Sequence, residues 1–361
     1  MNITHISAGR DRSMALANDG TALGWGGIKL LGATLPPGYP GELCTSNATE
    51  IGHNRYAQPL PQTLNPGQAF VGLVDGYVDS LAIARTGSVL SCRPVVSATH
   101  GAQHAPVAGL PASPRQVALT ESAGFALYAD GAVWSWGLRG NGQLGRAVDT
   151  RHAPPDQITG LTNIRALAAG HGHVLALDSS GRVWAWGANA AGQLGNGGLQ
   201  EGAQPQAIFL PSRIQHIGAG DTHSFAVDDK GRLWGWGANN HGQVGDASAR
   251  YFARPQRIRT GFTVAQIDAG MFYTAARSTH GDVFAWGWNG MGQLGRDGVG
   301  YSSTPVRIPS LSNVTQLAAG VGHVLASNGH GLWAWGDNRA SACGQFPSTT
   351  VQLAPHPISF A

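Results

Sequence analysis

Residues 183–197 read VWAWGANAAGQLGNG, in which Gly187 and Gly192 are separated by four residues. This spacing is the glycine skeleton of a P-loop, whose backbone N–H groups cradle phosphates. However, Gln193 and Leu194 stand where such a loop has lysine and then serine or threonine. No helical pattern follows to supply an N-terminal dipole. We therefore predict that these glycines form a structural turn, and we expect no cofactor.

A second group with possible chemistry is a set of recurring histidines. His173, His223 and His323 occupy one repeated position, and Tyr273 fills it in another copy. With His171, His173 forms a His-Gly-His pair, but no cysteine or carboxylate nearby in the sequence completes a metal site. We predict hydrogen bonds to backbone between neighbouring repeats, and no metal.

Nucleophilic and acid–base motifs are also missing from the sequence. It contains no G-x-S-x-G and no H-E-x-x-H, and the adjacent pair Asp228-Asp229 falls in a predicted hairpin turn. The residues therefore do not predict an enzyme, although propellers do hold active sites around their central channel.

The elements that position these residues form an internal repeat. The motif of residues 183–195 returns at 133–145, 233–245 and 283–295, and more loosely at 332–345. Its second aromatic residue recurs at intervals of 50 with one deletion, at Trp136, Trp186, Trp236, Trp286 and Trp335. Two degenerate copies, at 3–27 and 70–92, bring the count to seven repeats. A period of this length indicates a solenoid or a propeller.

Each repeat divides into four short strands. In one copy these are IRALAAG, VLALDSSG, RVWAWG and a P-x-x-I segment, separated by glycine, asparagine, aspartate or proline. Seven such units predict an all-β protein, a seven-bladed β-propeller with four-stranded blades that forms a single domain over 1–361. The N-terminal segment at 2–9 and the C-terminal segment at 355–358 read as consecutive pieces of one repeat. We expect these two strands to pair and close the ring.

These repeats resemble the regulator of chromosome condensation family, whose repeat reads roughly A-x-G-x-x-H-x-x-A-L, a turn, and W-G-x-N-x-x-G-Q-L-G. The match is strong in the four repeats from 114 to 310, moderate in the first and last, and poor in the second. The resemblance implies a seven-bladed propeller. Roles known in the family are guanine-nucleotide exchange on a Ran-type GTPase with chromatin attachment, and inhibition of β-lactamases.

Strand alternation places the loops after the first and third strands of every repeat on one face. That face also carries the longest insertion, a proline- and glycine-rich loop at about 27–68. Apolar residues in the loops of the sixth repeat, with arginines in other repeats, are typical interface anchors. The alternative is that the insertion folds over them. The predicted partner-binding residues are Met271, Phe272, Trp288, Met291, Arg10, Arg139, His241, Asp221 and Arg339.

The sequence thus predicts a non-enzymatic propeller that binds a protein partner through its loop-rich face. The alternatives are an exchange factor for a small GTPase, an inhibitor of a hydrolase such as a β-lactamase, and a structural or decoration subunit of a larger assembly. We expect a monomer outside such an assembly.

Composition narrows the partners and the compartment. The net charge is +3, from 23 basic and 20 acidic residues, which does not predict a nucleic-acid surface. No apolar run is long enough for a membrane helix, and no secretory signal is visible, so a cytoplasmic or otherwise not Sec-secreted protein is expected. For Cys44, Cys92 and Cys343 we expect free thiols, with a Cys44–Cys92 disulfide as the alternative.

Overall fold

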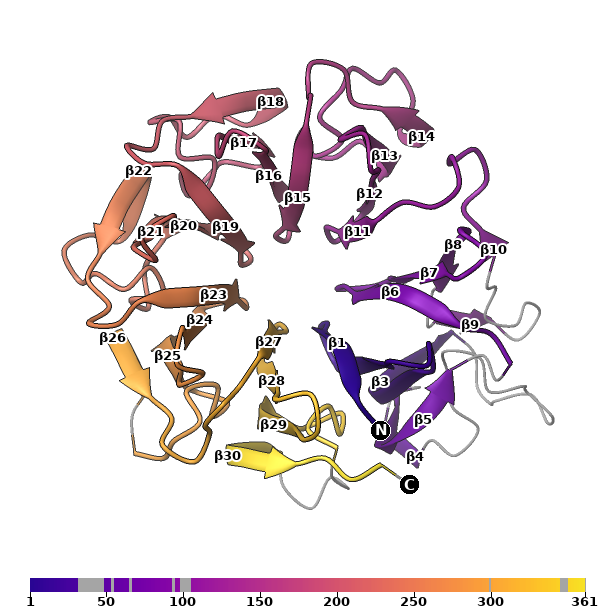
Figure 1. Ribbon diagram of the computed structural model, residues 1–361, viewed down its shortest axis with the longest axis vertical. Coiled ribbons are helices and arrows are strands. Elements are labelled where there is room, and N and C mark those ends of the chain that lie inside the picture. Colours follow the sequence, from indigo (N-terminus) through magenta and orange to yellow (C-terminus); the bar gives the residue numbers. More distant parts are fainter. Residues whose placement is uncertain are drawn as a thin grey trace.

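A computed structural model describes residues 1–31, 49–52, 55–64, 67–92, 95–97, 105–298, 300–344 and 350–360. In these residues the chain forms seven sheets, antiparallel apart from one short parallel pairing, arranged as blades around a central axis, with no helix (Figure 1). In blades 3 to 7 the strands pair in chain order, and the first strand of each blade lies nearest the axis. The predicted all-β, seven-bladed propeller is confirmed.

Six blades have four strands each. Blade 2 contains β6 (Phe70–Asp75), β7 (Ser80–Ala84), β8 (Val89–Cys92) and β10 (Ala105–Pro106). Blade 3 contains β11 (Gln116–Leu119), β12 (Ala123–Leu127), β13 (Val133–Leu138) and β14 (His152–Gln157). Blade 4 contains β15 (Ile164–Ala169), β16 (His173–Asp178), β17 (Val183–Gly187) and β18 (Gly202–Ile208).

The next three blades follow the same plan. Blade 5 contains β19 (Ile214–Ala219), β20 (His223–Asp228), β21 (Leu233–Ala238) and β22 (Tyr251–Ile258). Blade 6 contains β23 (Val264–Ala269), β24 (Tyr273–Ser278), β25 (Val283–Trp288) and β26 (Tyr301–Arg307). Blade 7 contains β27 (Gln316–Ala319), β28 (His323–Ser327), β29 (Leu332–Asp337) and β30 (Val351–Pro357).

Blade 1 is larger than the predicted four strands. Its path is β1 (Ile3–Ala8), β2 (Arg12–Ala17), β3 (Ala22–Leu31), β5 (Arg55–Leu64) and β4 (Thr49–Gly52), and β9 (Val95–Ser97) pairs parallel to β3. The segment 27–68, predicted as a loop, therefore contributes strands at both of its ends. Residues 32–48, 53–54 and 65–66 of this segment, with Cys44, lie outside the described residues.

The ring closes differently from the predicted pairing of the terminal strands. β1 is the innermost strand of blade 1 and pairs with β2, whereas β30 is the outermost strand of blade 7 and pairs with β29. Each blade is thus built from one repeat, and blade 7 meets blade 1 as any two neighbours meet. The Ile3 amide donates to the Gly329 carbonyl at 2.8 Å, and Trp25 Nε1 donates to the Ala342 carbonyl at 2.9 Å.

The repeated tryptophan explains why the glycine motif recurs. Trp186 and Trp236 are fully buried, and their Nε1 atoms donate to the backbone carbonyls of Gln143 and Gln193 in the preceding blade, both at 2.8 Å. A Cβ at Gly195 would lie 2.8 Å from Nε1 of Trp236, so the loop has no room for a side chain there. Gly195 therefore serves packing between blades, whereas the sequence predicted a structural turn at the P-loop-like glycines.

The recurring histidines also bridge neighbouring blades, and hydroxyl groups are partners of their rings. Nε2 of His173 lies 2.8 Å from Ser224 Oγ, and Nε2 of His323 lies 2.9 Å from Ser13 Oγ. Each serine hydroxyl donates onward to a backbone carbonyl, so each histidine must donate from Nε2. Burial lowers the pKa of His173 to about 3, so its ring is neutral in the folded protein.

Candidate partner-binding face

The loops after the first and third strands of each blade lie on one face of the ring, which we call the loop face. The loops after the second and fourth strands lie on the opposite face, which we call the turn face. Hairpin connectivity alone produces this division, because consecutive antiparallel strands run in opposite directions. The loop face therefore carries both loops that hold the variable residues of the repeat.

A ring of seven residues surrounds the axis on the loop face, and each stands two positions after the last residue of the first strand of its blade. At six of the seven seams within the described residues, a backbone N–H of one blade donates to a carbonyl of the next. The Asp221 amide, for example, donates to the Gly270 carbonyl at 3.1 Å, and the Met271 amide donates to the Val321 carbonyl at 3.2 Å. These bonds fix the spacing of the mouth ring, which consists of Arg10, Tyr77, Glu121, His171, Asp221, Met271 and Val321.

Three predicted aromatic and imidazole rings meet beside the mouth ring. Phe272 and Trp288 of blade 6 are perpendicular, with ring centroids 6.2 Å apart. His241, from the loop between β21 and β22 of blade 5, lies 5.0 Å from Phe272 and 6.4 Å from Trp288. All three side chains are half-buried. We call this group, together with Met271 and Met291, the aromatic patch.

The local backbone holds the aromatic patch in place. The Trp288 amide donates to the Phe272 carbonyl at 2.9 Å, which ties the two loops of blade 6 together. The Trp288 ring lies against Gly290, where a Cβ would come within 2.1 Å of the ring. The Asn289 side chain accepts a hydrogen bond from the Leu294 amide at 2.8 Å, which braces the loop that carries Met291.

Met271 is the most exposed member of the aromatic patch, at 36% of its surface. The Met271 amide donates to the Val321 carbonyl in blade 7, and the carbonyl of the preceding Gly270 accepts from the Asp221 amide in blade 5.

Asp221 is buried, and its Oδ1 atom has no hydrogen-bond partner among the described residues. Burial raises the pKa of Asp221 to about 7. The structure thus brings six of the nine predicted site residues onto blades 5 and 6.

The three predicted arginines lie on other blades and are bound within them. Arg339 pairs with Asp337 at 2.5 Å, and the Arg10 guanidinium lies 4.0 Å from the Asp11 carboxylate. Arg139 donates to the Val148 carbonyl at 2.9 Å. Among the described residues, none of the three forms a hydrogen bond or an ion pair with a member of the aromatic patch.

Sequence reasoning did not select a second cluster at the mouth ring. Tyr77 and His171 meet edge to face with centroids 4.7 Å apart, and Nε2 of His171 lies 3.1 Å from Glu121 Oε2. These residues come from three successive blades. The sequence signal that could have identified these three residues is their shared position in the repeat. Each directly follows the residue that ends the segment of the first strand.

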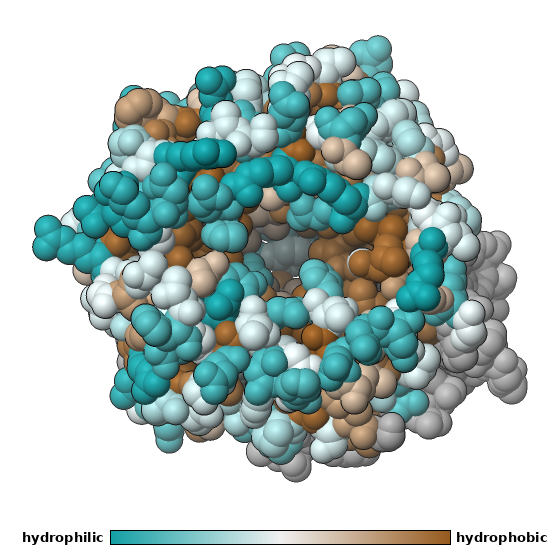
Figure 2. All heavy atoms as spheres, viewed as in Figure 1, coloured by the Kyte–Doolittle hydropathy of each residue, from teal (hydrophilic) through white to brown (hydrophobic). Residues whose placement is uncertain are grey.

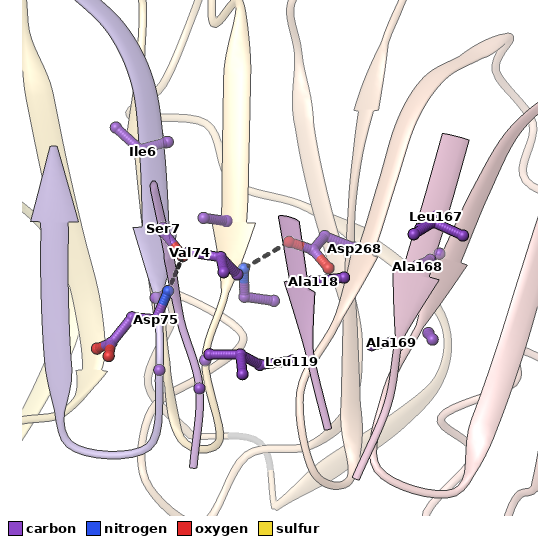
Figure 3. A pocket seen from close by; sticks show the side chains of 18 of the residues that line it. Ile6, Ser7, Val74, Asp75, Ala118, Leu119, Leu167, Ala168, Ala169 and Asp268 are labelled. Carbon is purple, nitrogen blue, oxygen red and sulfur yellow. Dashed lines mark hydrogen bonds between the residues drawn. The ribbon is translucent and has the colours of Figure 1, made fainter. Parts of the chain in front are cut away.

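The axis of the ring encloses a channel of about 650 Å³, lined mainly by the first strands of the blades (Figures 2 and 3). Figure 2 shows strongly hydrophilic side chains along part of its rim. Asp268 does not project freely into the channel, because its Oδ2 accepts from the Ala319 amide at 2.9 Å (Figure 3). The described residues contain no group of three or more histidine, cysteine or acidic side chains placed to hold a metal.

Two further observations concern predicted features. Cys343 is a buried free thiol. No helix in the part of the chain that the structure describes is long and apolar enough to cross a membrane.

The middle of the 27–68 insertion lies outside the described residues. The described strands of this insertion belong to blade 1, which is two blades from the aromatic patch.

The fold and the repeat define a seven-bladed propeller with one repeat in each blade and its variable residues on one face. A family model of the RCC1-like domain matches residues 37–361, so the chain belongs to the RCC1-like domain family. No curated protein matches the sequence.

Solved structures with this fold share little sequence identity with the chain. The crystal structure of Prp20p from Saccharomyces cerevisiae, a protein studied for its binding to Gsp1p and histones, has a TM-score of 0.71 and 20% identity, covering 88% of this chain and 80% of that one. Human WBSCR16 has a TM-score of 0.62 and 19% identity, covering 100% and 83%. Yeast RCC1 (Prp20), in its complex with Kap60, has a TM-score of 0.63 and 20% identity, covering 99% and 75%.

Proposed function

We propose that this chain is a non-enzymatic binding propeller that engages a protein partner through its loop face, with the aromatic patch as the anchor. The observation that carries the proposal is the meeting of His241, Phe272 and Trp288 from two blades in a half-buried cluster with Met271 exposed beside it. Centrally placed aromatic side chains of this kind contribute most of the free energy in many interfaces.

Rigidity supports the same proposal. The mouth ring is joined by hydrogen bonds from blade to blade, and the Trp288 and Phe272 loops are joined to each other. Loops that are already ordered lose little conformational entropy on association, so a larger share of the contact energy appears as affinity. One protein that shares this fold binds other proteins: Prp20, the yeast RCC1, binds Gsp1p and histones, and it also binds Kap60.

The test is an affinity measurement with matched aromatic truncations on opposite faces. A partner is first isolated from the native host with the intact chain, and its dissociation constant is then measured for Trp288→Ala and Phe209→Ala. Phe209 is 83% exposed and follows β18 on the turn face, so its truncation removes a similar area from the other side. We expect Trp288→Ala to weaken binding at least about 30-fold, corresponding to a cost of about 2 kcal/mol.

Phe209→Ala should leave the same affinity within about twofold. Equal losses for the two variants, or a loss only for Phe209→Ala, would place the interface elsewhere and overturn the proposal.

Guanine-nucleotide exchange is a second candidate, favoured by membership of the RCC1-like family and by the binding of Gsp1p by Prp20p. It predicts that catalytic amounts of the chain accelerate nucleotide release from a Ran-type GTPase. Inhibition of a hydrolase or co-migration with a large particle would instead favour one of the other binding roles. In each case Trp288→Ala should reduce the effect.

A further inference from the structure

A pocket of about 540 Å³ opens on the turn face of blade 4, and we call it the turn-face pocket. It lies where β17 begins and β18 ends, between the hairpin turn after β16 and the connection from β18 to β19. Its lining includes the buried Val183 and Ile208, the exposed Phe209, and two arginines, Arg182 and Arg213. The described residues that line it include no aspartate or glutamate, so the pocket is positively charged.

Backbone pairing and one side-chain bond give the turn-face pocket its shape. Val183 and Ile208 are cross-strand partners at the end of the blade. Nη2 of Arg213 donates to the Ser179 carbonyl at 3.0 Å, which joins the two loops that border the pocket. The Arg213 side chain packs against Gly181, where a Cβ would clash with Cγ of the arginine. The pocket is therefore already formed in the free protein, which lowers the entropic cost of binding.

Phe209 at the edge of this pocket is not required by the fold. Among the large apolar residues that the structure describes, it has the largest exposed fraction, at 83% of its surface. The same repeat position, directly after the repeated isoleucine, holds small, polar or charged residues or proline in other blades. An exposed aromatic ring next to arginines is typical of a contact with another protein. The residues at this position in the other blades are Thr159, Arg259, Pro309 and Ser359.

The guanidinium groups of the pocket keep most of their donors unused. In blade 5 the equivalent of Arg182 is Arg232, which pairs with Asp228 at 2.6 Å. Within the described ranges the Arg182 side chain forms no hydrogen bond or ion pair, and its guanidinium carbon lies 5.9 Å from the centroid of the Trp184 ring. Arg213 uses one nitrogen, in the bond that joins the two loops. Because a guanidinium carries five N–H donors, both groups can bind an anionic ligand.

We propose that the turn-face pocket binds a short acidic segment of a protein partner, in which a carboxylate stands beside a large apolar side chain. The carboxylate accepts charge-assisted hydrogen bonds from Arg182 and Arg213. The apolar side chain lies against Phe209 and covers the pocket floor at Val183 and Ile208. This site is on the opposite face from the aromatic patch, so it is independent of the function proposed for the loop face.

A peptide fits this pocket better than a nucleic acid or a small molecule. Phe209 is exposed over most of its surface, so a ligand that covers it must extend beyond the pocket, as a peptide does. Arginine clusters that recognise acidic segments are a recurring mode of peptide binding. A nucleic acid would need a run of basic side chains along its phosphate backbone, and the 23 basic residues of the chain are almost balanced by 20 acidic ones.

The first experiment selects ligands from a phage-displayed library of short random peptides. The chain is the bait, and phage that also bind the double variant Arg182→Gln/Phe209→Ala are removed. We expect the retained peptides to share an aspartate or glutamate next to an aromatic or large aliphatic residue. If no peptide is retained, or if the retained peptides share no acidic residue, the proposal is overturned.

Fluorescence polarisation then measures the affinity of one retained peptide labelled with fluorescein. Arg182→Gln and Phe209→Ala should each weaken binding about tenfold or more, since one removes a charged hydrogen bond and the other an aromatic contact. The matched control is Arg259→Gln, which removes the same charge from an exposed turn-face arginine outside the pocket. It should change the affinity less than about twofold. Equal effects of Arg182→Gln and Arg259→Gln would indicate non-specific attraction and overturn the proposal.

Trp288→Ala separates this site from the loop face, because it should leave the affinity for the peptide within about twofold. Each of the two proposals can therefore fail without the other. Phe209 is exposed and Arg182 forms no side-chain hydrogen bond in the described chain, so neither substitution should alter thermal unfolding. Self-association that Phe209→Ala abolishes in analytical ultracentrifugation would make a second copy the occupant. That result, or binding of a single-stranded oligonucleotide with no peptide selected, would also refute the assignment.

Discussion

The histidine–hydroxyl bridges between blades can be tested energetically at the seam between blades 5 and 6. Nε2 of His223 lies 3.2 Å from Thr274 Oγ1, whose hydroxyl donates to the Gln243 carbonyl at 2.8 Å. Thr274→Val keeps the shape of the side chain and removes the hydroxyl. The Gln243 carbonyl stays satisfied, because it also accepts from Trp286 Nε1 at 2.9 Å. The buried His223 N–H loses its acceptor.

The expected cost follows from that single unpaired group. A buried donor left without a partner costs about 1–3 kcal/mol, so Thr274→Val should lower the free energy of unfolding by about 2 kcal/mol. The chain itself supplies the matched background. At the seam between blades 3 and 4 the same two positions are Ala123 and Val174, and both are fully or almost fully buried. His223→Ala therefore creates a background in which Thr274→Val should cost less than about 0.5 kcal/mol.

Urea unfolding followed by tryptophan fluorescence measures all four proteins of this cycle. Both backgrounds keep a phenylalanine two residues on, at Phe125 and Phe225, so the apolar pair has a native precedent. If Thr274→Val costs the same with and without His223, the bridge contributes no coupling energy and the reasoning fails.

Three further predictions concern pH and backbone. First, the three bridging histidines are neutral in the folded protein, with pKa values of about 3, 3 and 4. Because these histidines have a pKa of about 6.5 in the unfolded chain, the free energy of unfolding should be highest above pH 6.5 and fall as the pH drops toward 4. The expected loss at pH 4.5 is about 2–3 kcal/mol for each histidine. A urea midpoint that is unchanged between pH 7 and pH 4.5 would contradict this. Second, burial raises the folded-state pKa of Asp221 to about 7, so its carboxylate destabilises the fold increasingly from about pH 4 to pH 7. Asp221→Asn should raise the melting temperature at pH 8 and leave it unchanged at pH 4, and the opposite ranking would show that the carboxylate is bound favourably. Third, Gly187 has a φ of 102° and a Cβ there would lie 2.4 Å from the Gly172 carbonyl, whereas Gly261 has a φ of 76° with open space around it. Gly187→Ala should therefore destabilise the protein by several times the roughly 1 kcal/mol expected for Gly261→Ala, and equal losses in thermal unfolding would show that φ alone decides the cost.

The amino-acid sequence by itself determined the blades. The tryptophan strand, the glycines that follow it and the proline within the fourth strand are each required by local structure within one repeat, so they recur visibly every 50 residues. The same pattern gave the loop face, because hairpin direction follows from strand order alone. The sequence also contains a repeated pairing across the seams between blades. A histidine in one blade has a serine or threonine partner in the next blade, although that hydroxyl partner was recognised only in the structure.

Contacts between repeats were decided only by the tertiary structure. His241 joins Phe272 and Trp288 because neighbouring blades bring their loops to one place, while Arg139 lies three blades from Trp288 and stays apart. Ring closure by packing rather than by strand pairing has the same origin, since the N-terminal strand is innermost in its blade and the C-terminal strand outermost in the other. Periodicity reports what each repeat needs locally, whereas the depth and angle at which blades meet depend on packing between residues far apart in the chain.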